Sequence, residues 1–158
     1  TTLSQIKISD VINDSISGLA LRENIDVPVT IEPDLPFVLG EGSQLIRALQ
    51  NLIGNAQDAM DGPGTITVDA RRIEDSVQIR VSDSGIGIDQ ENLESIFEPL
   101  YTAKSHGTGL GLAICREIVG RYKGTISVES TVGVGTTFTV CIPMAGPPGK
   151  EVSRPVPG

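Results

Sequence analysis

Four runs of alternating apolar and polar residues constrain the fold of this chain more than any other feature. Two of them, TITVDARRI at 65–73 and SVQIRVSD at 76–83, are joined by the polar residues EDS. Two more, GTISVEST at 124–131 and TTFTVCIPM at 136–144, flank the turn VGVG. Alternation with a period of two is typical of strands that bury one face, and short polar or glycine-rich joints favour antiparallel pairing. The sequence therefore predicts two antiparallel strand pairs.

Helical periodicity fills the segments before and between these strands. It predicts helices at 4–24, 44–60, 89–97 and 109–122. The first helix carries an apolar stripe, formed by Val11, Ile12, Ile16, Leu19 and Ala20. In this order, helices and strands predict an α+β fold in which helices cover one face of a mostly antiparallel sheet.

The connections between these elements follow from their turn residues. The alternating VPVTIEP predicts a short strand at 27–33, and 35–43 is a connector in which Ser43 is the expected N-cap of the next helix. DGPG at 61–64 predicts a turn, and 99–107 is irregular. The Pro- and Gly-rich residues 145–158 are expected to form a disordered tail, which leaves 1–144 as one domain.

The composition fits a globular domain and narrows its partners. Of 158 residues, 39% are hydrophobic and only 3% aromatic, with no Trp, so the core is expected to be aliphatic. The net charge of −8 argues against nucleic acid or an anionic membrane as a non-specific partner. It does not argue against a nucleotide, which needs only a local positive site.

Cysteine usage and hydropathy suggest a cytoplasmic protein. Cys115 and Cys141 lie in apolar runs without metal or disulfide spacing, so both are expected to be buried thiols in a reducing cytosol. No signal peptide opens the chain, and no apolar run is long enough to span a membrane. Because the chain begins at Thr1 rather than Met, we expect a fragment of a longer protein.

A polar stripe borders the core face of the helix at 44–60. That face consists of Leu45, Leu49, Leu52, Ile53, Ala56, Ala59 and Met60. Asn51, Asn55 and Asp58 have i, i+4, i+7 spacing and stack beside it. The stripe is either a solvated surface or a site at the edge of the core, where an amide oxygen is a suitable Mg²⁺ ligand beside water and phosphate.

Two loops are further candidates. Asp83 ends a strand and precedes Gly85 and Gly87 in DSGIGI, so its carboxylate either accepts a hydrogen bond from an exocyclic amine or caps a local turn. KSHGTGLGLAIC at 104–115 fits neither the Walker A pattern nor the Rossmann fingerprint. It remains a glycine turn that opens a helix, whose free N–H groups and dipole favour an anion. GVGTTF at 133–138 taken alone is an ordinary hairpin.

Together and in this order, NLIGNAQDA, DSGIGI, GTGLGL and GVGTTF resemble the N, G1, G2 and G3 boxes of the GHKL ATP-binding (HATPase_c) superfamily, and IFEPLYTAK resembles the F box of sensor histidine kinases. The resemblance spans residues 3–143. It implies the Bergerat/GHKL fold, a two-layer α/β sandwich in which three helices cover one face of a mixed sheet of about five strands. It also implies Mg²⁺ and ATP bound under a lid at 98–107, short as in nitrogen-regulator-type sensor kinases.

The resemblance assigns roles to individual residues. Asn55 matches the Mg²⁺ ligand, Asn51 and Asp58 lie beside it, and Asp83 matches the reader of the adenine amino group. Lys104 is a phosphate contact by its charge, and with Asn51 and Asn55 it forms the expected catalytic set. The remaining matched contacts are Gly85, Gly87, Ile88, Gly107, Thr108, Gly109, Leu110, Gly111, Leu112 and Thr136. Phe97 matches the F-box residue.

Two departures favour a histidine kinase. Where related ATPases and Ser/Thr kinases have a Glu one turn before the metal-binding Asn, this chain has Asn51. A histidine acceptor needs less help from a base because it is nucleophilic when neutral. The chain also lacks a His-Glu or His-Asp acceptor motif, so the residue that receives the phosphoryl group is expected on a separate dimerisation domain, to which the helix within 1–24 leads. The lone His106 falls in the lid, on the donor side, and is not the expected acceptor.

The predicted function is therefore the catalytic domain of a two-component sensor histidine kinase. It is expected to bind ATP or ADP, to transfer the γ-phosphoryl group to that histidine, and to supply a response regulator receiver domain. As a fragment it is expected to be a monomer that binds nucleotide without autophosphorylating, from a parent that is cytoplasmic or membrane-anchored. The alternatives are an anti-sigma-type Ser/Thr kinase and a non-catalytic nucleotide-binding module.

Overall fold

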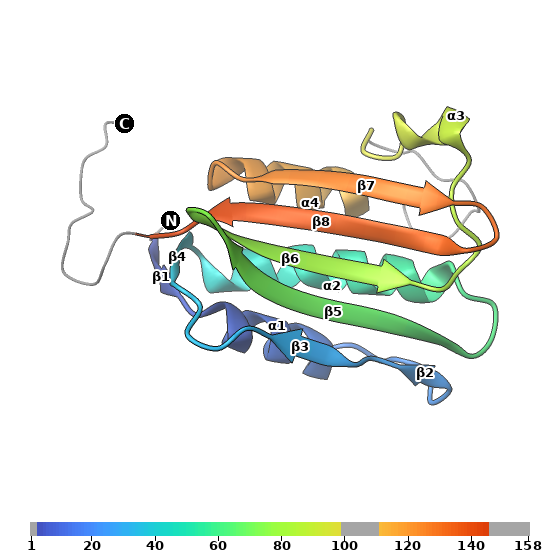
Figure 1. The fold of residues 1–158 in the computed structure, drawn as a ribbon, viewed down its shortest axis with the longest axis horizontal. Coiled ribbons are helices and arrows are strands. Elements are labelled where there is room, and N and C mark those ends of the chain that lie inside the picture. Colours follow the sequence, from blue (N-terminus) through green and yellow to red (C-terminus); the bar gives the residue numbers. More distant parts are fainter. Residues whose placement is uncertain (1–2, 99–110, 146–158) are drawn as a thin grey trace.

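The computed structural model describes residues 3–98 and 111–145, and Figure 1 shows their arrangement. Six strands of this part form one sheet in the order β2-β5-β6-β8-β7, with β3 beside β2 on the same edge of β5. The strands are β2 (Ile25–Asp26), β3 (Val29–Ile31), β5 (Gly64–Ile73), β6 (Ser76–Asp83), β7 (Thr125–Thr131) and β8 (Gly135–Pro143). A separate pair is formed by β1 (Ser4–Ile6) and β4 (Val38–Gly40).

The sheet is antiparallel except at one edge. The pairs β5–β6, β6–β8 and β7–β8 are antiparallel, which confirms both predicted strand pairs. Only the short strands β2 and β3 run parallel to β5. The predicted count of about five strands differs from the observed six because the first edge of the sheet is split into these two short pieces.

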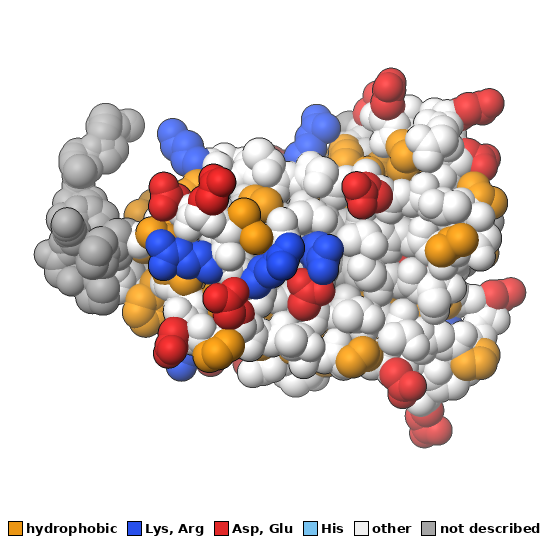
Figure 2. All heavy atoms as spheres, viewed as in Figure 1, with side chains coloured by type: hydrophobic (Ala, Val, Ile, Leu, Met, Phe, Trp, Pro, Cys, Tyr) orange, Lys and Arg blue, Asp and Glu red, His pale blue; other side chains and the backbone are white. Residues whose placement is uncertain are grey.

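Three helices lie side by side on one face of the sheet: α1 (Ile8–Ser17), α2 (Gly42–Asp58) and α4 (Gly111–Arg121) (Figure 1). The short α3 (Gln90–Leu93) lies beyond the end of the sheet. This arrangement confirms the predicted two-layer α+β fold. None of the described helices covers the opposite face, and Figure 2 shows mostly uncharged side chains on it, with Lys and Arg gathered away from the end that carries α3.

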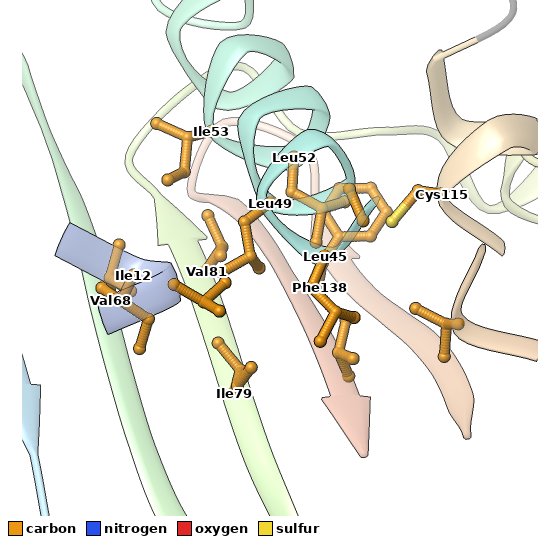
Figure 3. Close-up of a cluster of buried hydrophobic side chains, with 14 of the residues drawn as sticks. Ile12, Leu45, Leu49, Leu52, Ile53, Val68, Ile79, Val81, Cys115 and Phe138 are labelled. Carbon is orange, nitrogen blue, oxygen red and sulfur yellow. The ribbon is translucent and has the colours of Figure 1, made fainter. Parts of the chain in front are cut away.

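The core lies between α2 and the inner face of the sheet. Figure 3 shows Leu45, Leu49 and Leu52 of α2 directed toward Val81 and Phe138 on the strands. These five side chains are at most 3% exposed. Phe138 is the largest fully buried side chain, and its neighbours are mostly aliphatic, as the low aromatic content predicts. The long strands β5, β6 and β8 each have one buried face, and this fixes the inward direction of their alternate residues.

The N-terminal predictions are wrong in three places. Residues 4–24 do not form one helix, because Ser4–Ile6 pairs with Val38–Gly40 as β1 and α1 extends only from Ile8 to Ser17. The predicted connector at 35–43 therefore contains a strand. Ala20 of the predicted stripe lies beyond the helix and is exposed. The non-local pairing of β1 with β4 overrides the local helical periodicity.

The cap of α2 and one cysteine also differ from expectation. Glu41, with extended backbone angles, is the N-cap residue, and Ser43 already lies within the helix. Cys115 is buried as predicted, and burial raises the pKa of its thiol to about 12. Cys141 is only half-buried. It alternates with Val140 and Ile142, which are buried, so its side chain lies on the uncovered face of β8.

The buried strand face predicts a clear contrast between two valines. Val68 on β5 is 0% exposed, whereas Val134 in the β7–β8 turn is 68% exposed. Val68→Ala is expected to lower the free energy of unfolding by roughly 1.5–3 kcal/mol, because it removes buried methyl groups and leaves a void. Val134→Ala is the matched control, with an expected change within about 0.5 kcal/mol. Urea denaturation measures both, and equal effects would contradict the placement of β5 in the core.

Candidate functional site

The predicted site residues that the structure describes come from separate segments. Asn51, Asn55 and Asp58 lie on α2, and Asp83 is the last residue of β6. Gly85, Gly87 and Ile88 follow in the loop before α3, Thr136 is the second residue of β8, and Gly111 and Leu112 open α4. Lys104, Gly107, Thr108, Gly109 and Leu110 lie outside the described residues, as does His106.

Helix α4 begins against the polar stripe of α2. The Asn51 side-chain amide donates a hydrogen bond to the Gly111 carbonyl oxygen at 3.1 Å. This contact joins residues 60 positions apart and brings the start of α4 beside the asparagines. A Cβ atom at Gly111 would lie 3.7 Å from Asn51, an ordinary contact, so the packing of the two helices does not by itself require glycine there.

The three side chains of the polar stripe on α2 differ in solvent exposure. Asn51 and Asn55 are half-buried at the border of the core, one helical turn apart, whereas Asp58 at the end of the helix is exposed. With its amide nitrogen engaged by Gly111, Asn51 keeps its carbonyl oxygen as an acceptor. The two asparagines thus provide neutral oxygen donors in a partly desolvated position. Within residues 3–98 and 111–145, no group of three or more His, Cys, Asp or Glu side chains is placed to hold a metal ion.

Asp83 is a half-buried carboxylate held by backbone N–H groups. It lies opposite Thr136 in the β6–β8 register, and its Oδ1 accepts a hydrogen bond from the Gly85 N–H at 2.8 Å. Burial raises the pKa of Asp83, while backbone N–H groups of Gly85 and Thr136 partly oppose this rise. The carboxylate is therefore fixed in direction but only partly hydrogen-bonded. Such a group accepts hydrogen bonds from an incoming donor.

The loop after Asp83 is pressed against two other backbones. Ile86 N–H donates to the Ala59 carbonyl at the end of α2, at 3.1 Å, and a Cβ atom on Gly85 would lie 2.6 Å from that same oxygen. Gly87 has a φ of +80°, and its Cβ atom would meet the backbone of Thr131. Both positions therefore require glycine, and the loop beside Asp83 is held close to the backbones of Ala59 and Thr131.

Sequence reasoning missed Ser130, which joins this loop to β8. The Ser130 hydroxyl lies 2.7 Å from both the Ile88 backbone nitrogen and the Thr136 hydroxyl. Thr136 is 4% exposed, one of the two buried polar residues in the described part of the chain. A signal was present in the sequence, because alternation along β7 places Ser130 on the same face as Val128 and Ile126.

Phe97 connects this end of the sheet to α4. Its ring packs edge-on against Phe138, with centroids 6.1 Å apart, and the Arg116 guanidinium lies 5.6 Å from its centroid. The matched F-box residue thus lies between the core and α4, immediately before the segment that carries the predicted lid.

Comparisons with known proteins show the family and the fold. Residues 40–146 match the HATPase_c family, described as histidine kinase-, DNA gyrase B- and HSP90-like ATPases. Sensor histidine kinase ZraS from Salmonella typhi is 38% identical over 147 residues, which cover 90% of this chain and 32% of ZraS. The chain thus spans about a third of the length of such curated relatives. Within the described residues, no helix is long and apolar enough to cross a membrane.

Solved structures show the same fold. The mycobacterial sensor histidine kinase MprB superimposes with a TM-score of 0.83 and 26% identity, over 90% of this chain and 98% of that chain. Full-length ShkA, solved in complex with AMPPNP, superimposes with a TM-score of 0.80 and 25% identity, over 90% of this chain and 31% of that chain.

A comparison of two glycines with positive φ distinguishes the cost of backbone strain from the cost of steric contact. Gly87 and Gly133 have φ of +80° and +83°, but only Gly87 has atoms within 4 Å of a Cβ position. Gly133→Ala is expected to cost about 1–2 kcal/mol of unfolding free energy from the left-handed backbone alone. Gly87→Ala is expected to cost roughly 1–3 kcal/mol more, because the loop must move away from Thr131. Equal losses in urea denaturation would contradict the tight packing of this loop.

Proposed function

The chain belongs to the family of histidine kinase-, DNA gyrase B- and HSP90-like ATPases, as its motifs indicate, and on this premise we propose that it binds Mg²⁺-ATP and phosphorylates a histidine on a separate domain. One observation carries the proposal. The contact between Asn51 and Gly111 puts the start of α4 beside the asparagine stripe. The loop that follows Asp83 is hydrogen-bonded to the Ala59 carbonyl at the end of α2, the helix that carries the asparagines. We therefore assign the groups suited to a phosphate and to a base to one site.

Asp83 reads the base in this proposal. Its carboxylate accepts a hydrogen bond from the 6-amino group of adenine, which has two N–H donors. Gly85 and Gly87 keep the loop beside Asp83 packed against Ala59 and Thr131, and Thr136 lies next to Asp83 across the strands. ShkA, whose fold this chain shares, was solved with AMPPNP, an ATP analogue, and this supports the proposed ligand.

The phosphates and the metal ion lie at the other end of the site. The N-terminus of α4 offers free N–H groups and the positive end of the helix dipole to the phosphates. Asn55 and Asn51 fit Mg²⁺ as neutral oxygen donors, since this ion takes most of its remaining ligands from phosphate and water. When bound, Mg²⁺ neutralises charge on the transferring phosphoryl group. Lys104 and the glycines at 107, 109 and 111 complete the proposed phosphate contacts.

The proposed phosphoryl acceptor, a histidine, follows from the absence of a general base at Asn51. An amide at this position does not serve as a general base for a hydroxyl group or for water, whereas a neutral imidazole is already nucleophilic. The curated relatives are named sensor histidine kinases, and the chain spans about a third of their length. We therefore place the acceptor histidine in a dimerisation domain outside this chain and a receiver domain after it in the relay. Residues 1–144 are the proposed catalytic domain.

Phosphotransfer between separate domains tests this function. The chain is mixed with a His-bearing helical hairpin from the same parent and with ATP labelled on the γ-phosphate. The expected product is an acid-labile, base-stable phosphate on the hairpin. An acid-stable phosphoprotein would instead indicate a Ser/Thr kinase, and ATP binding without any transfer would indicate a non-catalytic nucleotide module.

The metal assignment is tested by one asparagine substitution. Asn55→Ala is expected to lower the rate of transfer at least about 100-fold, because an oxygen that holds charge-neutralising Mg²⁺ is lost. Asn13→Ala is the matched control, since Asn13 is exposed on α1. Its rate is expected to equal that of the wild type. An undiminished rate for Asn55→Ala would remove Asn55 from the metal site.

The raised pKa of Asp83 predicts how base recognition depends on pH. The carboxylate is charged above its pKa, so preference for a 6-amino purine is present at neutral pH and is lost as pH falls through a value above the usual 3.8. Calorimetry measures the ratio between the affinity for ATP and the affinity for purine riboside triphosphate, which lacks the amino group. Because both ligands carry the same triphosphate, protonation of the phosphates changes both affinities alike and cancels from the ratio. Asp83→Asn is expected to remove the pH dependence of this ratio. A ratio that stays constant in the wild type would exclude the Asp83 carboxylate as the reader.

A further inference from the structure

Three polar side chains form one row across the inner face of the sheet. In the strand register, Thr136 of β8 pairs with Asp83 of β6 on one side and with Ser130 of β7 on the other. Directly opposed residues on one face of a sheet have Cβ atoms close enough to interact. Only Asp83 and Thr136 belong to the proposed base contacts, so Ser130 is the member of the row without an assigned role.

The Ser130 hydroxyl has three hydrogen-bond partners. It lies 2.7 Å from the Ile88 backbone nitrogen, 3.1 Å from the Gly135 carbonyl oxygen and 2.7 Å from the Thr136 hydroxyl. A serine hydroxyl offers one donated proton and two acceptor lone pairs. Three partners therefore use its full capacity, and this restricts which atom donates in each contact.

Only one assignment satisfies all three contacts. The Ile88 N–H can only donate and the Gly135 carbonyl can only accept, so the single Ser130 proton goes to Gly135. Thr136 must then donate its own proton to Ser130. The Thr136 oxygen keeps its lone pairs as acceptors, next to the Asp83 carboxylate, which also accepts. This end of the row presents acceptors alone to a ligand.

We propose that Ser130 is a positioning residue that determines base specificity, because it holds the Thr136 hydroxyl in the acceptor direction. A base with an amino group at C6 supplies hydrogen-bond donors to both Asp83 and Thr136. A 6-oxo base instead places a carbonyl oxygen, which is an acceptor, opposite these two acceptors, so no hydrogen bond forms there. The same hydroxyl binds Ile88 and thereby holds the loop beside the base. This inference rests on the proposed function and adds Ser130 as a residue that strengthens the preference for a 6-amino over a 6-oxo purine.

The uncovered face of the sheet offers a matched control. One residue along the same strands, the hydroxyls of Ser82 and Thr137 lie 2.7 Å apart. Alternation directs this pair away from the row of Asp83, Thr136 and Ser130. Thr137→Val removes one side-chain hydrogen bond from β8 on the opposite face, whereas Ser130→Ala removes the three hydrogen bonds of its hydroxyl from β7 on the inner face.

The experiment compares the affinities of ATP and inosine triphosphate, a 6-oxo nucleotide, by calorimetry with Mg²⁺. Ser130→Ala is expected to reduce the preference for ATP about 5- to 10-fold, which is the contribution of one hydrogen bond. Ser130→Thr keeps the hydroxyl and is expected to retain the preference. Thr137→Val is expected to match the wild type. Ser130→Cys nearly preserves the side-chain shape but weakens both the hydrogen-bond donor and the acceptor. It is the second variant in case Ser130→Ala does not fold, and it is expected to show the same reduced preference for ATP.

The outcomes separate this inference from the proposed function. A wild type that binds neither nucleotide would overturn both. A wild type that binds ATP and inosine triphosphate equally would overturn the inference and leave nucleotide binding intact. Unchanged discrimination in Ser130→Ala and Ser130→Cys, or an equal loss in Thr137→Val, would also overturn it, because the effect would then be absent or merely structural.

Discussion

The register between β6 and β8 is the constraint on which the rest of the site depends. It places Asp83 opposite Thr136 and directs both toward the helices. Because side chains alternate with a period of two, a slip of one residue would turn a strand's inner residues outward. Ser82 and Thr137 would then occupy the inner face. The buried positions Val81 and Phe138, also opposed in this register, resist such a slip because it would expose them to water.

Helix α2 serves the core and the site at once. Its apolar face is buried on the sheet, and the half-buried Asn51 and Asn55 lie at the edge of that face, with Asn51 bonded to α4. The packing that stabilises the fold therefore also positions the polar groups. The carbonyl of Ala59 at the end of the same helix binds the loop after Asp83. One helix thus connects both ends of the proposed nucleotide site.

Local patterns predicted most of this structure, and the failures have physical causes. The paired strands and the helices α2 and α4 follow from periodicity over many residues. The pairing of Ser4–Ile6 with Val38–Gly40 was missed because it is non-local and each strand has only three residues. The site loops were found through glycine patterns and family resemblance. Alternation along β7 places Ser130 on the inner face, but its three hydrogen-bond partners depend on the strand register, which a local pattern does not contain.

The pairing of β1 with β4 has a mechanical consequence. Val38 on β4 also bridges to Met144, so the first and last described segments of the chain meet at one end of the molecule, and the site lies at the other (Figure 1). Helix α2 runs between these ends and has 17 residues, a length of about 25 Å at 1.5 Å per residue. The proposed nucleotide site therefore lies far from the strands that hold the first and last described segments. A rotation of the domain about those strands would displace the proposed site more than it displaces any part nearer to them.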